Sequence, residues 1–314
     1  MVAEELIITD GNFHAGDLNV PLVTMNGGVA SVSNIGLLDS LTMTSAEFHG
    51  GLSMSAKKIY GTNSSLGGSL IQVKQGPAVI DFFSSQINAG TLDADFMNLD
   101  LCTVSAGIML TQQTIANNSS FQAGLLNARV GRSLFYLNIG SVTASHINAG
   151  TFNVRDVTTT TPFMEGDTLL TLRGSIHDPG EDSLRIHFFH RSFIDSTLVY
   201  SDMIYASLAQ AEVTHGSRFE SDRRGDGPRS ELITFPGEDL SGGNGASYGG
   251  YGGTTGDMNV TRFTPAHDPV SVPDFSADDV KKGLGGFGLN NLGWHDSAGV
   301  GGGRIRIDAS GLVW

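Results

Sequence analysis

The chain carries little charge for its length, and this shortage narrows the functions it can have. Lysine, arginine, aspartate and glutamate make up 16% of its 314 residues, against about 25% in ordinary soluble domains. The charge that is present is mostly acidic, with 32 Asp and Glu against 18 Lys and Arg and a net charge of −14. Because nucleic-acid binding requires clustered basic side chains that displace counterions, we expect no nucleic-acid partner.

Cysteine and long apolar runs are also scarce. The single cysteine, Cys102, excludes an internal disulfide, and its alternation with apolar neighbours predicts a small buried core residue. No run approaches the roughly 18 apolar residues of a membrane helix, so we expect no membrane span. Residues 1–5 lack the basic region and apolar core of a signal peptide, and residues 311–314 stop within a strand-like pattern. We therefore expect this chain to be a segment of a longer protein.

Glycine is abundant instead, with 42 residues, and it recurs within a ten-residue phrase. The copies are GNFHAGDLNV at 11–20, AEFHGGLSMS at 46–55, SQINAGTLDA at 85–94, SSFQAGLLNA at 119–128 and SHINAGTFNV at 145–154. Each copy holds an apolar residue, a polar residue, a small residue, glycine and then a second apolar residue. Self-similarity of this kind indicates an architecture of stacked repeats rather than a single-core domain.

The spacing of the repeat selects among stacked architectures. With partial copies included, the glycines recur about every 18 residues, whereas leucine-rich repeats need roughly 20–29 and helical repeats more. Within each unit, short runs alternate between apolar and polar residues, and Gly, Asn and Ser separate the runs. The sequence therefore predicts an all-β fold, a parallel β-helix (solenoid) with rungs of about 18 residues.

In such a coil the phrase has a structural role. We expect its first apolar residue to point inward and stack on its counterparts, which gives the ladder Phe13, Phe48, Ile87, Phe121 and Ile147. We expect its glycine to form a turn with positive φ where a β-carbon would clash, which applies to Gly16, Gly51, Gly90, Gly124 and Gly150. The phrase is then scaffold rather than a binding site.

The pattern divides the chain into three sections. Residues 1–157 hold the regular β-helix repeats, and residues 158–240 continue them with wider rungs and loops. Residues 241–314 are glycine-rich loops and strands, and their run RIRIDAS alternates as a strand of a further rung. We expect this third section to continue the helix.

One cluster in the middle section has residue types suited to chemistry. Its members are His177, Asp178, Glu181, Asp182, His187 and His190. Paired carboxylates beside histidine serve acid–base catalysis or bind a metal. Strand alternation, however, places His187 and His190 on opposite faces, so they share one cleft only if a bulge intervenes. We assign no catalytic, cofactor-binding or metal-ligating residue, and we expect a protein that is not an enzyme and needs no cofactor.

Four Asn-X-Ser/Thr sequons mark candidate sites for covalent glycans. They are Asn63, Asn117, Asn118 and Asn259. A sequon is used only in a secreted protein, so these residues are candidate glycan sites if the chain reaches the extracellular space, and the sequence does not say which of them are occupied.

The glycine-rich section carries a resemblance. The order GGNGASYGGYGG at 242–253 and GGGRIRIDASG at 301–311 resembles a module of large secreted glycine-rich β-helix proteins of protists and some bacteria. Among these it looks most like components of ciliary or flagellar hairs (mastigonemes), which are glycosylated extracellular filaments. The resemblance implies a structural subunit of an extracellular filament or surface appendage. Its partners would be other copies of itself or other filament proteins.

Two other functions remain open. The stretches SSQINAGTLDADFMNLD at 84–100 and SHINAGTFNVRDV at 145–157 are similar to phrases of phage tail-tip and tail-fibre proteins, which implies a receptor-binding fibre or tailspike. Polysaccharide lyases and hydrolases also use β-helices. Their sites need clustered acidic and basic residues on one face, which the regular rungs lack, and a fold alone does not imply an activity.

Overall fold

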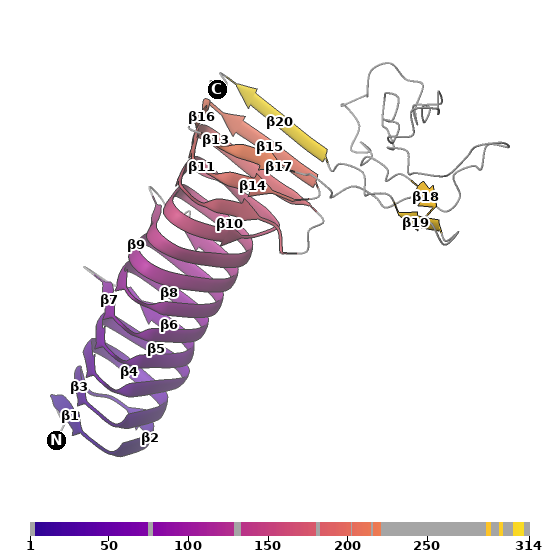
Figure 1. The fold of residues 1–314 in the computed structure, drawn as a ribbon. Helices are drawn as coiled ribbons and strands as arrows, with labels where there is room; N and C mark the ends of the chain where they lie inside the picture. Colours follow the sequence, from indigo (N-terminus) through magenta and orange to yellow (C-terminus); the bar gives the residue numbers. More distant parts are fainter. Residues whose placement is uncertain are drawn as a thin grey trace, which may run out of the picture.

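The computed structural model describes residues 4–74, 78–128, 133–179, 183–201, 203–214 and 216–220, together with strands at 287–289, 295–297 and 304–310. The described chain is all β and winds into a parallel β-solenoid of about 11 turns, with rungs about 18 residues apart (Figure 1). The predicted fold class is confirmed. Among the described residues there is no helix long and apolar enough to cross a membrane.

The strands pair in parallel from one coil to the next. Those of the N-terminal coils are β1 (Glu5–Thr9), β2 (Asn12–Leu18), β3 (Leu22–Asn26), β4 (Val29–Thr44), β5 (Glu47–Thr62), β6 (Ser65–Val73), β7 (Val79–Phe83), β8 (Gln86–Asp100) and β9 (Thr103–Ala128). Those that follow are β10 (Leu134–Thr160), β11 (Phe163–Leu172), β12 (Ser175–His177), β13 (Leu184–Asp195), β14 (Leu198–Tyr200), β15 (Met203–Ala209), β16 (Ala211–Thr214), β17 (Arg218–Glu220) and β20 (Arg304–Ser310). A separate pair, β18 (Phe287–Leu289) and β19 (His295–Ser297), is antiparallel.

One coil shows the cross-section of the rod. In residues 101–118 side chains alternate between buried and outward-facing, except at three places where two neighbours both face outward. Because a strand turns successive side chains to opposite faces, each such place is a corner. The coil therefore has a first side (103–107), a second side (108–111) and a third side (113–117), and these names apply to the register-equivalent residues of every coil.

Apolar side chains stack from coil to coil inside the rod. On the first side, Phe48 pairs with Leu66 and Leu66 with Ile87 in successive coils. Each of the three is at most 1% exposed. Because full burial of a side chain of this size contributes roughly 1.5–3 kcal/mol, these ladders stabilise the coil along its whole length.

The corner between the third side and the next first side has a fixed backbone conformation. We call it the return corner. Its residues have φ between 44° and 60° in almost every coil and are Asp10, Ser45, Asn63, Ser84, Leu101, Asn118, Ile139, Asp156, Arg173 and Ser196. Asn and Asp tolerate this left-handed conformation, whereas leucine and isoleucine are strained in it.

The residue after the return corner points inward and is small, and its hydroxyl links two coils. Ser85 Oγ donates to the carbonyl oxygen of Phe83 at 2.7 Å and accepts from the backbone N–H of Ser64 at 3.0 Å. Ser119 Oγ donates to the carbonyl oxygen of Asn117 at 2.6 Å and accepts from the N–H of Cys102 at 3.1 Å. These hydroxyls satisfy buried N–H groups that the change of direction would leave without an acceptor.

Cys102 occupies the same inward position as these serines. It is 2% exposed, as the sequence predicts, and its Sγ lies 3.2 Å from the carbonyl oxygen of Asp100 and 3.3 Å from that of Phe82. Burial raises the pKa of the Cys102 thiol, so the sulfur keeps its proton and donates to these carbonyls.

The middle section continues the same coil. The return-corner residues Asp156, Arg173 and Ser196 are 17 and then 23 residues apart, so the second of these rungs is wider than the first. The RIRIDAS strand, β20, pairs in register with β15 and adds a second-side strand after β17, so it belongs to a further rung. The rest of residues 241–314, apart from β18 and β19, lies outside the described residues.

Ile139 is the return-corner residue least suited to its backbone. Its φ is 60°, and left-handed backbone costs a side chain of this kind roughly 1–2 kcal/mol. We expect Ile139→Asn to raise the free energy of unfolding by about 1 kcal/mol in denaturant melts. The control is Ile108→Asn, which changes a similarly exposed isoleucine in a strand without positive φ. An equal rise in both variants would contradict the strain at this corner.

The hydroxyl of Ser119 is expected to stabilise the fold more than that of its neighbour. Ser119→Ala leaves the buried N–H of Cys102 without its acceptor and should lower the free energy of unfolding by about 1–3 kcal/mol. Ser120→Ala removes only an exposed hydrogen bond to Ser141 and should change the free energy of unfolding by less than about 0.5 kcal/mol. Thermal and urea unfolding of the two variants compare these effects, and similar losses would refute the role of the inward hydroxyl.

Candidate functional site

The residues expected to form one core ladder occupy two ladders. Phe48, Ile87 and Phe121 are at most 2% exposed, and Phe13 packs half-buried against the same core in the first coil. Phe13 and Phe48 both pair with Ala30 on the first side. Phe121 pairs with Val142 on that side.

Ile147 is fully buried but lies in a different ladder. It pairs with Leu126 and Met164 on the second side. Phe121 stands three residues after its return corner at Asn118, whereas Ile147 stands eight residues after Ile139. The assignment of Ile147 to the Phe13 ladder is therefore wrong, because the same local phrase fits either side and only the corner fixes which side it forms.

The phrase glycines are not turn residues with positive φ, so that part of the prediction is wrong. Positive φ among the described glycines occurs at Gly11, Gly27, Gly28, Gly140 and Gly216. The steric part of the expectation holds at Gly51, Gly90, Gly124 and Gly150, where a β-carbon would lie 2.6–2.8 Å from an oxygen atom of a neighbouring segment. Gly16 has no such neighbour within 4 Å. Glycine is thus needed at these positions for the close approach of coils rather than for a positive φ.

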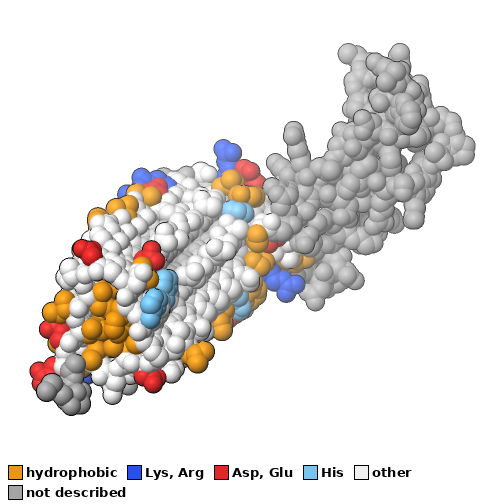
Figure 2. All heavy atoms as spheres, turned by 90° about the horizontal axis from the view of Figure 1, so that it is seen from below, with side chains coloured by type: hydrophobic (Ala, Val, Ile, Leu, Met, Phe, Trp, Pro, Cys, Tyr) orange, Lys and Arg blue, Asp and Glu red, His pale blue; other side chains and the backbone are white. Residues whose placement is uncertain are grey.

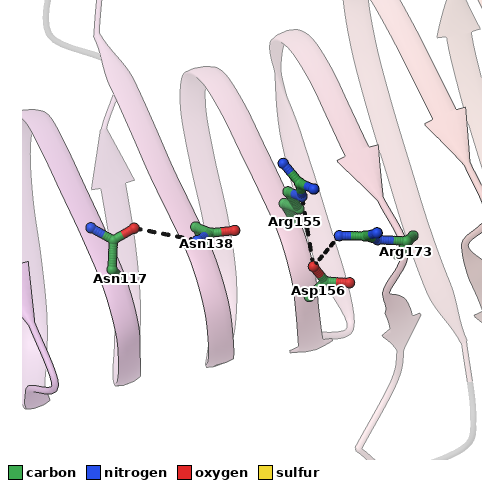
Figure 3. A network of polar contacts seen from close by, with 5 residues as sticks. All are labelled: Asn117, Asn138, Arg155, Asp156 and Arg173. Atoms are coloured by element: carbon green, nitrogen blue, oxygen red, sulfur yellow. Dashed lines mark hydrogen bonds and ion pairs between the residues drawn. The ribbon is translucent and has the colours of Figure 1, made fainter.

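The sequons cluster at the return corner. Asn63 and Asn118 are exposed corner residues. Asn117 precedes the corner, and its Oδ1 accepts a hydrogen bond of 3.4 Å from Asn138 Nδ2 in the next coil (Figure 3). In the sequon of Asn117 the hydroxyl residue is Ser119, which is 1% exposed. Asn259 lies outside the described residues.

The histidine and carboxylate cluster of the middle section is divided between two sides. His177 lies on the first side, where its Nε2 is 3.0 Å from Thr160 Oγ1 and its ring stacks on Tyr200 with centroids 4.7 Å apart. Asp178 is 5% exposed and accepts from the N–H of Ser183 at 3.2 Å. Glu181 and Asp182 lie outside the described residues.

His187 and His190 do not lie on opposite faces, which corrects the prediction from strand alternation. The register shifts between Gly166 and Thr168 of β11, so that Phe189 and His190 of β13 form a bulge. Phe188 points inward at 1% exposure, while His187 and His190 both face outward, and the ring of His187 lies 4.2 Å from that of Phe189. Among the residues described, no group of three or more His, Cys, Asp or Glu is placed to hold a metal ion.

A shallow depression on the second side was not anticipated from the sequence. It is open, has a volume of about 250 Å³, and is lined by residues that include Phe163, Arg185, His187 and Tyr205. Phe163 pairs with Arg185, and Arg185 with Tyr205, whose ring lies 5.9 Å from the guanidinium. The members lie about 20 residues apart, so only the coil register brings them together. This lining offers aromatic and cationic contacts, and it also holds Ser207, which is the register partner of His187.

Polar side chains form short contacts between neighbouring coils. Asp156 accepts from Arg173 at 2.6 Å and lies 3.7 Å from Arg155 (Figure 3). Asn98 Nδ2 donates to Asp81 at 3.0 Å, and Asn34 Nδ2 donates to Asp17 at 2.9 Å. Exposed pairs of this kind contribute little to stability. On the face seen in Figure 2, charged side chains are few and scattered and form no band of one sign.

Comparisons of the chain with known protein families, with curated proteins and with solved structures give no match. The function is therefore argued from the geometry of the coil and its surfaces.

The close approach of coils gives a direct test at the glycines. A β-carbon at Gly107 would lie 2.8 Å from the carbonyl oxygen of Gly90, so we expect Gly107→Ala to lower the free energy of unfolding by about 1–3 kcal/mol. Gly16→Ala is the matched control, because it alters the same phrase where nothing lies within 4 Å, and we expect it to be neutral. Urea melts that show equal stability for the two variants would contradict the stacking described for these glycines.

Proposed function

We propose that the protein is a structural subunit or segment of an extracellular filament or surface appendage. The observation that carries the proposal is the core, in which the buried apolar residues described between Ile8 and Val213 form one cluster. At about 4.8 Å per coil, the roughly 11 turns make a rod about 50 Å long. Such a rod resists bending because every coil is joined to the next by backbone hydrogen bonds and buried ladders.

Two surface features support an extracellular setting. The sequon residues Asn63 and Asn118 project at exposed corners, where a glycan fits without disturbing the core. The resemblance of the glycine-rich section to secreted β-helix proteins points in the same direction.

Parallel strands that continue end to end also provide unpaired edges through which rods extend.

Electron microscopy of the full chain tests this proposal. We expect the protein secreted from a eukaryotic host to carry N-linked glycans and to form unbranched filaments in negative stain. Phe121→Asp places a charge in the core ladder and should abolish the filaments, whereas Gln122→Asp changes the adjacent exposed residue and should preserve them.

Several outcomes would contradict the proposal. Dispersed single particles at high concentration would argue against a filament subunit. A trimer that resists detergent would favour a phage-fibre protein, and release of unsaturated sugars from polysaccharides would favour a lyase.

A further inference from the structure

We propose that the depression on the second side of the rod binds an acidic sugar, that is, one carboxylate-bearing hexose unit of a polysaccharide. Arg185 holds the carboxylate of that unit, and the rings of Phe163 and Tyr205 contact its C–H groups. The inference goes beyond the proposed filament role and does not depend on it, because it concerns three coils of a single rod.

Two outward columns of side chains border the depression. The first column holds Phe163, Arg185 and Tyr205, which are register partners in successive coils. The second column holds His187 and Ser207, two residues further along β13 and β15. Because neighbouring strands lie about 4.8 Å apart and every second residue of a strand about 7 Å apart, the columns outline an area of about 10 by 7 Å. An area of this size accommodates a single six-membered ring with its substituents.

The depression is small and shallow, which suits one unit of a hydrated polymer. Its volume of about 250 Å³ is below the roughly 300–1,000 Å³ of pockets that enclose drug-sized molecules. Ile186 and Ala206 also line it, but these residues are only 1% and 3% exposed and belong to the core, so the strand backbone forms the base. A sugar ring laid on this base leaves the neighbouring units of its polymer in water.

Arg185 differs from the other arginines whose side chains the structure describes. Each of the other four lies 2.6–3.8 Å from a carboxylate oxygen, and these are Arg155, Arg173, Arg191 and Arg218. Within the described part of the chain, the guanidinium of Arg185 makes no hydrogen bond and no ion pair, and it contacts the ring of Tyr205 at 5.9 Å from the centroid. Its N–H donors are therefore available to a ligand, and a carboxylate matches them in bidentate geometry.

The carboxylate beside the depression faces the preceding coil. Glu165 is the register partner of His187 and lies two residues from Phe163 in β11. Its Oε1 lies 3.6 Å from Nε2 of His146. The ring of His146 also meets the ring of Phe163 edge-on, with centroids 4.5 Å apart and planes at 78°. His146 thus contacts both the carboxylate and the ring, so Phe163 is held in place and Arg185 is left to a ligand.

The combination of rings, a cation and hydrogen-bonding groups favours a sugar among carboxylate ligands. Phe163 and Tyr205 are half-buried on either side of Arg185, where their rings can pack on the apolar C–H groups of a sugar. His187 and the exposed Ser207 supply partners for its hydroxyls. A peptide carboxylate is instead captured by backbone N–H groups. Here β13 and β15 are paired on both edges, so their N–H groups are engaged in the sheet.

The second column contributes to binding rather than to catalysis. His187 and Ser207 are register partners, but no hydrogen bond joins them, and the ring of His187 lies 4.2 Å from that of Phe189. Nucleophilic catalysis needs a hydrogen bond between the nucleophile and its base. We therefore assign both side chains to the recognition of sugar hydroxyls.

Calorimetric titration tests the site in the full chain made in bacteria, where no N-linked glycan competes. The probes are tetramers of galacturonate, glucuronate and mannuronate, and the matched neutral probe of each is its methyl ester. At least one acidic tetramer should bind with a dissociation constant at least about tenfold below that of its ester, because Arg185 pairs only with the charged form. Arg185→Gln should remove this preference. Tyr205→Ala should raise the dissociation constant of the acidic tetramer at least about tenfold, because it removes one ring of the first column.

Two variants on the third side are the matched controls. Arg191→Gln alters an arginine of the same strand that lies 3.8 Å from Glu212, and Tyr136→Ala removes a half-buried ring away from the depression. Both should bind the acidic tetramer as the unaltered protein does, and circular dichroism checks that every variant keeps its fold. The site is overturned if no acidic tetramer binds, if the methyl esters bind equally well, or if Arg185→Gln keeps the preference for the acidic form.

Discussion

The structure depends on one constraint. After every coil the chain must return to the same position in the cross-section of the rod, one strand spacing further along the axis. Parallel strands pair along the whole rod only if each coil closes in register with the last. The return corner achieves this closure with left-handed residues such as Asn63, Leu101 and Ile139, followed by a small inward residue. Where that residue is Ser85 or Ser119, its hydroxyl accepts the N–H of the coil beside it. Strain at the corner is tolerated because each coil gains a buried ladder of apolar side chains.

Repetition explains how much of this fold could be read from the sequence. Alternation and glycine spacing predicted the parallel solenoid, and the inward direction of Phe48, Ile87 and Phe121 followed from them. Ile147 was placed on the wrong ladder because its phrase is local, while its side depends on the distance from Ile139. Leu101 and Ile139 gave no signal as corner residues, since neither belongs to the residue types that favour positive φ.

The candidate sites were less predictable than the fold, for a related reason. Residues that meet on the surface come from successive coils, so the depression lined by Phe163, Arg185 and Tyr205 becomes visible only when the register is known. The bulge at Phe189 and His190 also escaped prediction, because strand alternation assumes that no residue is inserted.

Together the core and the corners describe a rod whose strands run across its long axis. X-ray fibre diffraction from oriented filaments of the full chain tests this claim most directly. The account predicts a strong reflection near 4.8 Å along the filament axis, because the coils stack in that direction. A reflection of that spacing perpendicular to the axis, or its absence from well-oriented filaments, would contradict it.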